Sequence, residues 1–377
     1  MRRLLYGVVS GMMALIALAG QSCSKTYSTD EPLDSTYGAM VYVSSNNQIL
    51  RALDPETGKL QWEYRLNGDL STTPFLDDKA LYAITTDGVI HMLDPNTGTL
   101  QRQIVHPQAG LSSPVGDSVL LYFGGKVDSF YAMNVANGAP RWTFPATGPV
   151  LGSPLLFQGK LYFGTSNKKF FALNKTNGTK VWENDSNIIL GSFVSSPTWM
   201  GTMIFATNTD GYLYAFDMRT GRIRWRFRTP EPILSSPLAL SGSVMFGSND
   251  YVFYCVDTTT KAPRWKVQTA ERVLSSPVFA NDKVFFGSLD HSFYAQSFIN
   301  GEPKWSAQTG AAIQSSPLAA EGIIYVGGGD GYFYAFDADK GTQKWRYYLG
   351  GQIVSSPILR NEKNVIFYPT VSGASKK

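Results

Sequence analysis

Short apolar runs separated by turn residues follow one another along the chain. In residues 317–345, for example, runs of four or five mainly apolar residues are divided by Glu321-Gly322, Asp330-Gly331 and Lys340-Gly341. Such glycine-containing pairs are typical of tight turns between antiparallel strands. No segment keeps a period of 3.6 residues, so helices should be almost absent. We predict four strands in this unit, at 317–320, 324–327, 332–337 and 342–347.

The same unit occurs eight times, at intervals of 40 residues with one interval of 43. Each unit opens with a proline that Ser usually precedes, at Pro74, Pro114, Pro154, Pro197, Pro237, Pro277, Pro317 and Pro357. A tryptophan stands near the end of seven units, and Arg102 replaces it in the remaining one: Trp62, Trp142, Trp182, Trp225, Trp265, Trp305 and Trp345. Four residues before this position, a glycine ends a turn in every unit except that of Lys261.

This repeat predicts the fold class. Four antiparallel strands in about 40 residues are what one blade of a β-propeller requires, and radial packing covers faces that one blade cannot bury alone. We therefore predict an all-β, eight-bladed β-propeller of four-stranded antiparallel blades over residues 37–371. The seven tryptophans should join neighbouring blades, because one buried Trp removes roughly 150–250 Å² from water.

The two ends of the repeat predict how the ring closes. The first unit starts at a second strand, residues 39–44, whereas the last Ser-Ser-Pro strand, at Pro357, comes after the eighth tryptophan position. Pairing of the C-terminal strand with the N-terminal strands would complete one blade. Residues 364–369 have the pattern of an additional strand, which either pairs at the seam or displaces residues 39–44.

Composition narrows the classes of function. Charged residues make up 16% of the chain and hydrophobic residues 43%, which excludes a disordered chain and a charged coiled coil. The formal charge of +4 gives no support to nucleic-acid binding. Two cysteines, Cys23 and Cys255, cannot form a disulfide framework, and three histidines without ligand-like spacing argue against zinc. We expect no metal site and no cofactor.

The N-terminus has the pattern of an export signal. Arg2 and Arg3 precede an apolar run over residues 4–19, which is shorter than the roughly 20 residues that span a bilayer. We expect a signal peptide over residues 1–22. A polar tail over residues 372–377 ends the chain.

Cys23 indicates how the exported protein is held. It follows small residues and precedes the polar stretch 24–36, and so resembles the lipid-modified cysteine of bacterial lipoproteins, although Gly20 stands where Leu is usual. We expect a lipid anchor on Cys23, a flexible tether over residues 23–36, and attachment to the outer membrane. The alternative is cleavage near residues 17–19, which leaves a soluble periplasmic protein.

The strings Ser-Ser-Pro, Tyr-x-Gly, Asp-Gly-x-x-Tyr-Ala-x-Asp and Thr-Gly-x-x-x-Trp resemble the tryptophan-motif repeat of the pyrroloquinoline-quinone (PQQ)-like eight-bladed propellers. One branch of that superfamily, the quinoprotein dehydrogenases, holds PQQ and calcium over the propeller axis. Another, the outer-membrane assembly lipoprotein BamB, is a scaffold without catalytic activity. The length, the export signal and Cys23 resemble the second branch. The resemblance implies a monomeric, non-enzymatic scaffold that binds protein partners in the bacterial envelope.

The dehydrogenase branch implies a site that this sequence lacks. Those enzymes place PQQ against two adjacent cysteines, whereas Cys23 and Cys255 are far apart. The candidate acids recur in phase with the repeat, as expected of residues that cap turns: Asp54, Asp94, Asp217, Asp257 and Asp337. We expect no catalytic residue. A quinoprotein-like enzyme, or a propeller that senses a small ligand or a carbohydrate, remains the alternative.

One set of hydroxyl groups is expected at the propeller axis. The residue before each proline should lie at the same height on the innermost strand: Thr73, Ser113, Ser153, Ser196, Ser236, Ser276, Ser316 and Ser356. These hydroxyls either bind a small molecule in the channel or satisfy backbone groups at the strand ends.

Partner binding is expected where the repeat is least regular, because loops on a rigid scaffold usually carry function. Lys126, Asp128, Lys168 and Lys169 form a charged patch on the turns of the third and fourth units, or else a solvated rim.

The interval of 43 residues adds three residues between Trp182 and Pro197, in a segment with Ile188, Ile189, Leu190 and Phe193. These side chains either dock a partner, as exposed apolar groups often do, or fold inward, with Ile188, Leu190 and Phe193 filling a gap between blades.

Overall fold

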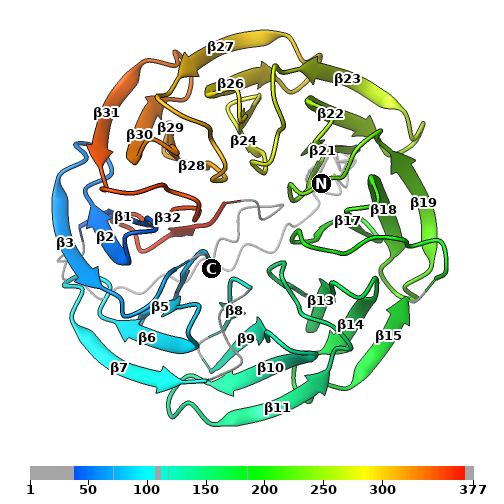
Figure 1. Ribbon diagram of the computed structural model, residues 1–377, viewed down its shortest axis with the longest axis horizontal. Coiled ribbons are helices and arrows are strands. Elements are labelled where there is room, and N and C mark those ends of the chain that lie inside the picture. The colour runs from blue at the N-terminus through cyan, green and yellow to red at the C-terminus, as the bar shows by residue number, and fades with distance from the viewer. Residues whose placement is uncertain (1–37, 71, 107–111, 118, 185, 370–377) are drawn as a thin grey trace, which may run out of the picture. The chain divides into compact units, whose positions relative to one another are not determined.

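The computed structural model describes residues 38–369 except 71, 107–111, 118 and 185. In these residues every regular element is a β-strand. Eight antiparallel sheets surround a central axis; in seven of them the first strand lies near the axis and the last strand on the outer rim (Figure 1). The predicted all-β, eight-bladed propeller is confirmed.

Blades 2 to 8 are four-stranded meanders in chain order. Blade 2 comprises β4 (Phe75–Leu76), β5 (Leu81–Ile84), β6 (Val89–Leu93) and β7 (Leu100–Val105). Blade 3 comprises β8 (Val115–Gly116), β9 (Leu120–Gly124), β10 (Ser129–Asn134) and β11 (Pro140–Pro145). Blade 4 comprises β12 (Leu155–Phe157), β13 (Lys160–Gly164), β14 (Phe170–Asn174) and β15 (Lys180–Asn184). Blades 5 and 6 comprise β16 (Thr198–Met200), β17 (Met203–Thr207), β18 (Tyr212–Asp217), β19 (Ile223–Arg228); β20 (Leu238–Leu240), β21 (Ser243–Gly247), β22 (Val252–Asp257) and β23 (Pro263–Gln268). Blades 7 and 8 comprise β24 (Val278–Ala280), β25 (Lys283–Gly287), β26 (Ser292–Ser297), β27 (Pro303–Gln308); β28 (Leu318–Ala320), β29 (Ile323–Gly327), β30 (Tyr332–Asp337) and β31 (Gln343–Tyr348).

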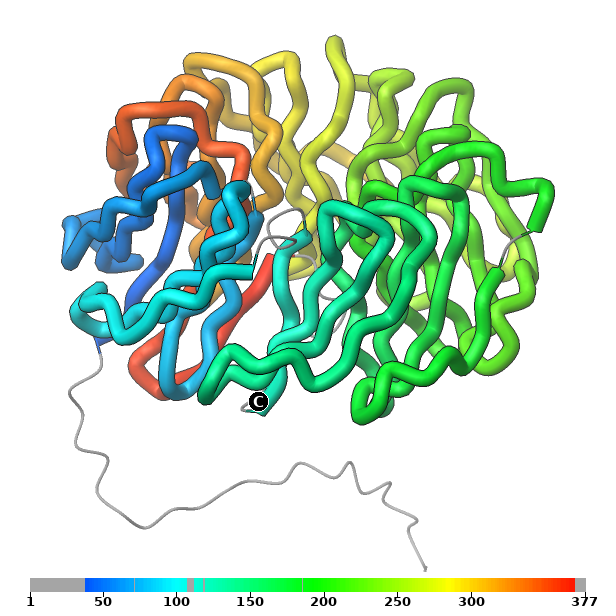
Figure 2. Tube along the Cα trace, turned by 60° about the horizontal axis from the view of Figure 1, so that its bottom comes forward, coloured from blue at the N-terminus to red at the C-terminus, as the bar shows by residue number. Residues whose placement is uncertain are grey.

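Blade 1 is the seam, and it is built from both ends of the chain. Its sheet has the order β3 (Leu60–Arg65), β2 (Ile49–Leu53), β1 (Met40–Ser44), β32 (Ile358–Arg360) and β33 (Ile366–Phe367). The predicted closure is confirmed by the antiparallel pairing of β1 with β32, which Figure 2 shows as the contact between the blue and red segments. β33 pairs with the inner edge of β32 and leaves β1 in place. The additional strand therefore pairs at the seam and does not displace residues 39–44.

The hydrophobic core lies between the blades. It divides into eight clusters, and the buried residues of each come from two blades that are neighbours in the ring. Each blade therefore buries apolar side chains on both faces, and its second and third strands are almost entirely buried. This explains the continuous apolar runs in the sequence.

The tryptophans lie at the junctions between blades, as predicted. Six indole N–H groups donate hydrogen bonds of 2.9–3.1 Å to a backbone carbonyl in the next blade: Trp62 to Pro95, Trp142 to Lys175, Trp182 to Met218, Trp265 to Phe298, Trp305 to Ala338 and Trp345 to Pro55. Each ring lies against the turn glycine of that next blade. At Gly221, for example, an added Cβ would lie 2.5 Å from Cε3 of Trp182. The glycine is required both for its positive φ of 70° and for this close approach.

Two junctions depart from this pattern. In blade 2 the Arg102 guanidinium replaces the indole and donates to the Ala136 carbonyl. At the junction of blades 5 and 6, Trp225 faces the turn that carries Lys261 in place of glycine, with a φ of 61°. Within the described part of the chain, the buried indole nitrogen of Trp225 has no hydrogen-bond partner.

Candidate functional site

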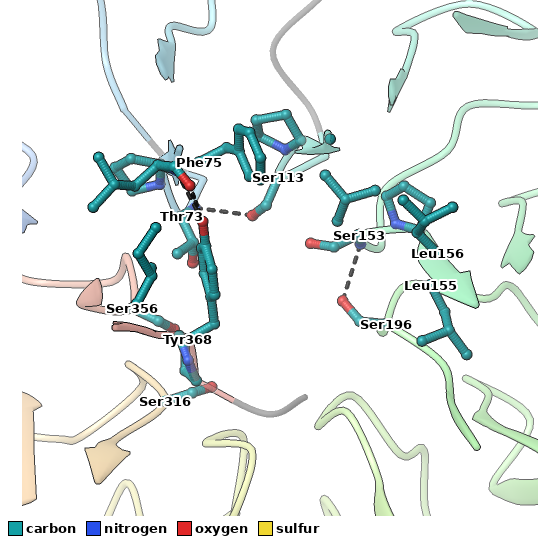
Figure 3. A pocket seen from close by; sticks show the side chains of 18 of the residues that line it. Thr73, Phe75, Ser113, Ser153, Leu155, Leu156, Ser196, Ser316, Ser356 and Tyr368 are labelled. Carbon is teal, nitrogen blue, oxygen red and sulfur yellow. Dashed lines mark hydrogen bonds between the residues drawn. The ribbon is translucent and has the colours of Figure 1, made fainter. Parts of the chain in front are cut away.

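The innermost strands surround a cavity of about 460 Å³ on the propeller axis. All eight residues predicted at the axis line it: Thr73, Ser113, Ser153, Ser196, Ser236, Ser276, Ser316 and Ser356. Four of the prolines that follow them also line the cavity. Figure 3 shows six of these residues around the cavity. The sequence therefore placed the axial hydroxyls correctly.

The two serines of each Ser-Ser-Pro motif have different roles. The first is buried and usually bonds within its own blade; the Ser235 hydroxyl, for example, donates to the Gly247 carbonyl at 2.7 Å and accepts from its N–H at 2.8 Å. Ser275 differs, because its hydroxyl donates to the Ser315 carbonyl of the next blade at 2.9 Å. The second bonds between blades, because its hydroxyl accepts from the backbone N–H of the equivalent residue one blade earlier. Five such bonds of 2.9–3.2 Å occur in the described part of the ring: Thr73 to Ser113, Ser153 to Ser196, Ser196 to Ser236, Ser236 to Ser276 and Ser276 to Ser316.

The C-terminal segment makes the cavity asymmetric. Tyr368, two residues from Ile366 at the start of β33, stacks on the Phe75 ring, with ring centroids 6.2 Å apart. Its hydroxyl donates to the Leu76 carbonyl at 2.6 Å and accepts from the Leu76 N–H at 3.0 Å, so it pairs with the edge of β4. Burial raises the pKa of Tyr368 and keeps it neutral. Ile366, Tyr368 and Pro369 all line the cavity, so β33 covers one side of it.

The loop with the three additional residues has both buried and exposed apolar side chains. Ile189 and Phe193 are buried, with 3% and 1% of their surface exposed, whereas Ile188 and Leu190 are exposed by 43% and 67%. Ile189 and Phe193 therefore cannot belong to a docking surface. Neither sequence alternative is correct as a whole, because Phe193 fills the gap between blades while Ile188 and Leu190 point outward.

Phe193 occupies a regular position of the repeat. The residue four places before the conserved proline position is buried in other blades as well, as with Val150 and Ile233. Phe193 packs directly over Gly164, the glycine of a Tyr-x-Gly string, where a Cβ would overlap it. If the repeats are aligned on their prolines instead of their tryptophans, Phe193 matches the buried residues Val150 and Ile233, which identifies it as a core residue.

The charged residues of blades 3 and 4 do not form one free patch. The Lys169 ammonium pairs with the Glu183 carboxylate at 2.5 Å, so its charge is matched within the blade. Asp128 and Lys168 are exposed on turns, with positive φ values of 30° and 66°, and Lys126 is half-buried.

The predicted turn-capping role of the in-phase aspartates is confirmed. The Asp217 carboxylate, for example, accepts from the N–H and the hydroxyl of Thr220 at 2.8 Å. Equivalent bonds hold the turns of Asp54, Asp94, Asp257 and Asp337. In the described residues no group of three His, Cys, Asp or Glu side chains is placed to hold a metal ion. Burial raises the pKa of the Cys255 thiol to about 11, so it is not a reactive nucleophile.

The expected signal peptide, tether and lipid-bearing Cys23, and the polar tail over residues 372–377, lie outside the described residues. Among the residues that are described, none forms a helix with the length and apolar character needed to cross a membrane.

Two solved structures have the same fold. The crystal structure of BamB from Moraxella catarrhalis is 16% identical, with a TM-score of 0.65 over 79% of this chain and 96% of that chain. The computationally designed protein Ika8 is 14% identical, with a TM-score of 0.70 over 81% of this chain and 98% of that one. No curated protein matches the sequence.

The family comparison covers most of the chain. The model described as outer membrane protein assembly factor BamB matches five overlapping segments, residues 21–114, 86–198, 190–271, 209–319 and 273–370. Together with the eight-bladed ring and its tryptophan junctions, these matches show that the chain belongs to the BamB family of PQQ-like propellers.

Proposed function

We propose that this protein is a non-enzymatic, monomeric scaffold of the bacterial envelope, held to the outer membrane by a lipid on Cys23 and acting in outer-membrane protein assembly. Family membership supports this role, because the matching model is described by that activity. The observation that carries the proposal is the loop of residues 186–194, which presents the exposed side chains of Ile188 and Leu190. Contiguous exposed apolar surface marks interaction sites on soluble proteins, and these two side chains, two residues apart on one loop, are the candidate for such a surface here.

The loop is held in one shape by polar bonds to blade 5. The Ile188 carbonyl accepts from the Tyr214 hydroxyl at 3.2 Å and from the Arg226 guanidinium at 3.3 Å. The Leu190 N–H donates to the Asp210 carboxylate at 3.0 Å. Because the loop is already ordered, a partner need not pay the entropy of fixing it on binding.

Basic groups lie beside the apolar side chains. The Arg226 guanidinium stacks over the Tyr212 ring at 4.3 Å, and Arg228 lies 5.8 Å from the same ring. A partner surface with an apolar centre and acidic residues at its edge would match this arrangement. Lys126, Asp128 and Lys168 on blades 3 and 4 are a second candidate contact region.

Partner capture from envelope membranes tests this proposal. The double variant Ile188→Ser, Leu190→Ser should melt within about 2 °C of the wild type, because both side chains are exposed, and should lose the captured partners. The matched control is Val181→Ser, Ile299→Ser, whose side chains are exposed by 43% and 77% elsewhere on the ring. If the loop variant captures every wild-type partner at the wild-type level, this loop is not the docking element.

The proposed anchor and the proposed lack of catalysis have their own tests. Cys23→Ser should move the protein from the membrane fraction to the soluble fraction, and an unchanged distribution would contradict lipidation. Calorimetry with PQQ and calcium should show no stoichiometric binding. A micromolar complex that reduces a dye with an alcohol or a sugar would instead establish the quinoprotein alternative.

A further inference from the structure

The axial cavity has an apolar part, whose side chains face one another across it, and a hydroxyl-lined part. Among the described residues, the larger apolar side chains of the lining come from blades 2 to 4 and from the C-terminal part of the chain that completes blade 1: Phe75, Leu76, Val115, Leu155, Leu156, Val354, Ile366 and Tyr368. Blades 5 to 7 contribute only the serines of the axial ring and one proline, Pro197. Figure 3 shows Phe75 and Tyr368 on one side of the cavity, with Leu155 and Leu156 on the opposite side.

The hydroxyl-lined part consists of hydrogen-bond donors. A serine hydroxyl has one proton and two lone pairs. In Ser196, Ser236, Ser276 and Ser316 the oxygen already accepts a backbone N–H from the preceding blade. Within the described residues these four hydroxyls donate to no protein acceptor, so their protons are available to a molecule in the cavity.

The charged residues of the lining, Asp77, Asp78 and Lys79, all belong to blade 2 and not to the serine-lined blades 5 to 7, so the head group is selected by the serine donors and not by net charge. The Asp77 carboxylate is occupied by the backbone N–H groups of Lys79 and Ala80, at 2.8 and 2.9 Å, and by the Tyr82 hydroxyl. Asp78 accepts from the Asn364 amide at 3.2 Å. Lys79 is the one basic residue among the described residues of the lining.

From these two parts we infer that the axial cavity binds one small amphipathic molecule. Its apolar body lies between blades 2 to 4 and Tyr368, and its head is an oxygen acceptor, such as a carboxylate, that receives protons from the serine ring. A volume of about 460 Å³ is in the range of sites for small organic ligands. The cavity lining includes no residue of the outer loop 186–194, so this inference can fail without affecting the proposed scaffold role.

Titration calorimetry with three ten-carbon probes tests the site: decanoate, decanol and decyltrimethylammonium. Decanoate should bind at one site with a Kd on the order of 100 μM or below. Decanol should bind several-fold more weakly, and the cation, which offers no acceptor, should not bind. Absence of saturable decanoate binding overturns the site, and equal binding of all three probes overturns the assigned head group.

Filling the cavity locates the binding. Leu156→Trp and, on the neighbouring blade, Val115→Phe enlarge half-buried side chains that line the cavity. Either variant that keeps the wild-type melting temperature should bind decanoate at least tenfold more weakly. The control, Leu100→Trp, changes an exposed residue of the outer strand β7 and should bind normally. Wild-type affinity in both folded cavity variants would place decanoate elsewhere and refute the inference.

Discussion

The junction between blades 4 and 5 and the junction between blades 5 and 6 differ at one turn residue. In the first, Trp182 is 7% exposed, lies against Gly221 and donates to the Met218 carbonyl at 3.0 Å. In the second, Lys261 replaces the glycine, and the indole nitrogen of Trp225 is unsatisfied. Trp225 is half-buried, but so are Trp142 and Trp305, which lie against glycines. The indole hydrogen bond of one blade therefore depends on the glycine of the next, and the two columns of the repeat form one interaction.

Removal of the indole should have the largest effect, and it should differ between the two junctions. Trp182→Ala should lower the free energy of unfolding by about 3–5 kcal/mol, the usual range for truncating a buried Trp. Trp225→Ala should cost at least about 1 kcal/mol less, since no hydrogen bond is lost. Chemical denaturation of both variants measures the difference, and equal losses would show that the junctions are equivalent.

A second substitution gives the junction between blades 4 and 5 the turn residue found at the junction between blades 5 and 6. Gly221→Lys adds a Cβ against the Trp182 ring at a positive φ, and should cost about 2 kcal/mol through backbone strain and displacement of the indole. Gly201→Lys is the control, because it also has a positive φ, of 60°, but no atom lies within 4 Å of its Cβ position. A loss no greater than that of the control would show that contact with the ring is unimportant.

The reverse change should repair the second junction. Lys261→Gly relieves a left-handed conformation and lets Trp225 approach the turn, so that its N–H reaches the Thr258 carbonyl. We expect a gain of about 1 kcal/mol in the free energy of unfolding. In the background Trp225→Ala, the same substitution should give a smaller gain. An identical gain in both backgrounds would assign the whole effect to backbone strain.

The smallest effect concerns Asp217, which caps the turn that ends at Gly221. The bond from Arg224 to Asp217, at 2.5 Å, lowers the pKa of Asp217 to about 2. As the pH falls below about 4, the unfolded chain takes up a proton before the folded chain does, so this contribution is lost between pH 4 and pH 2. Asp217→Asn should cost less than about 1 kcal/mol at pH 7, because Arg224 is exposed.

Acid melts of wild type and Asp217→Asn measure this contribution. The variant should lose less stability than the wild type between pH 4 and pH 2. Asn already caps the equivalent turns at Asn134 and Asn174, so the turn itself should persist. Parallel acid profiles would mean that Asp217 does not contribute to the acid sensitivity.

Much of this architecture could be predicted because each feature recurs in eight copies. The strand limits, the blade number, the ring closure and the axial position of Ser196 and its equivalents all follow from columns in the repeat. The unequal tryptophans could also have been predicted, because Lys261 is visible in the glycine column. A single sequence shows that exception but not its cost, which depends on the distance between an indole and a Cα in different blades.

The candidate sites were harder to predict because they depend on single residues. Tyr368 pairs with the backbone of β4, a contact that no spacing in the sequence indicates. Ile188 and Ile189 are adjacent and equally apolar, yet only Ile189 is buried, since the direction of each side chain depends on how Asp210 and Tyr214 hold the loop.

The seam also determines when the protein can finish folding. β1 can pair on its inner edge only when β32 is available, so blade 1 cannot be completed before the C-terminal residues are available. Until then its inner strand has unpaired backbone groups, and closure requires the two ends of nearly the whole chain to meet, which is slow. A ribosome that still holds the C-terminal residues would therefore keep the ring open and blade 1 incomplete until they are released.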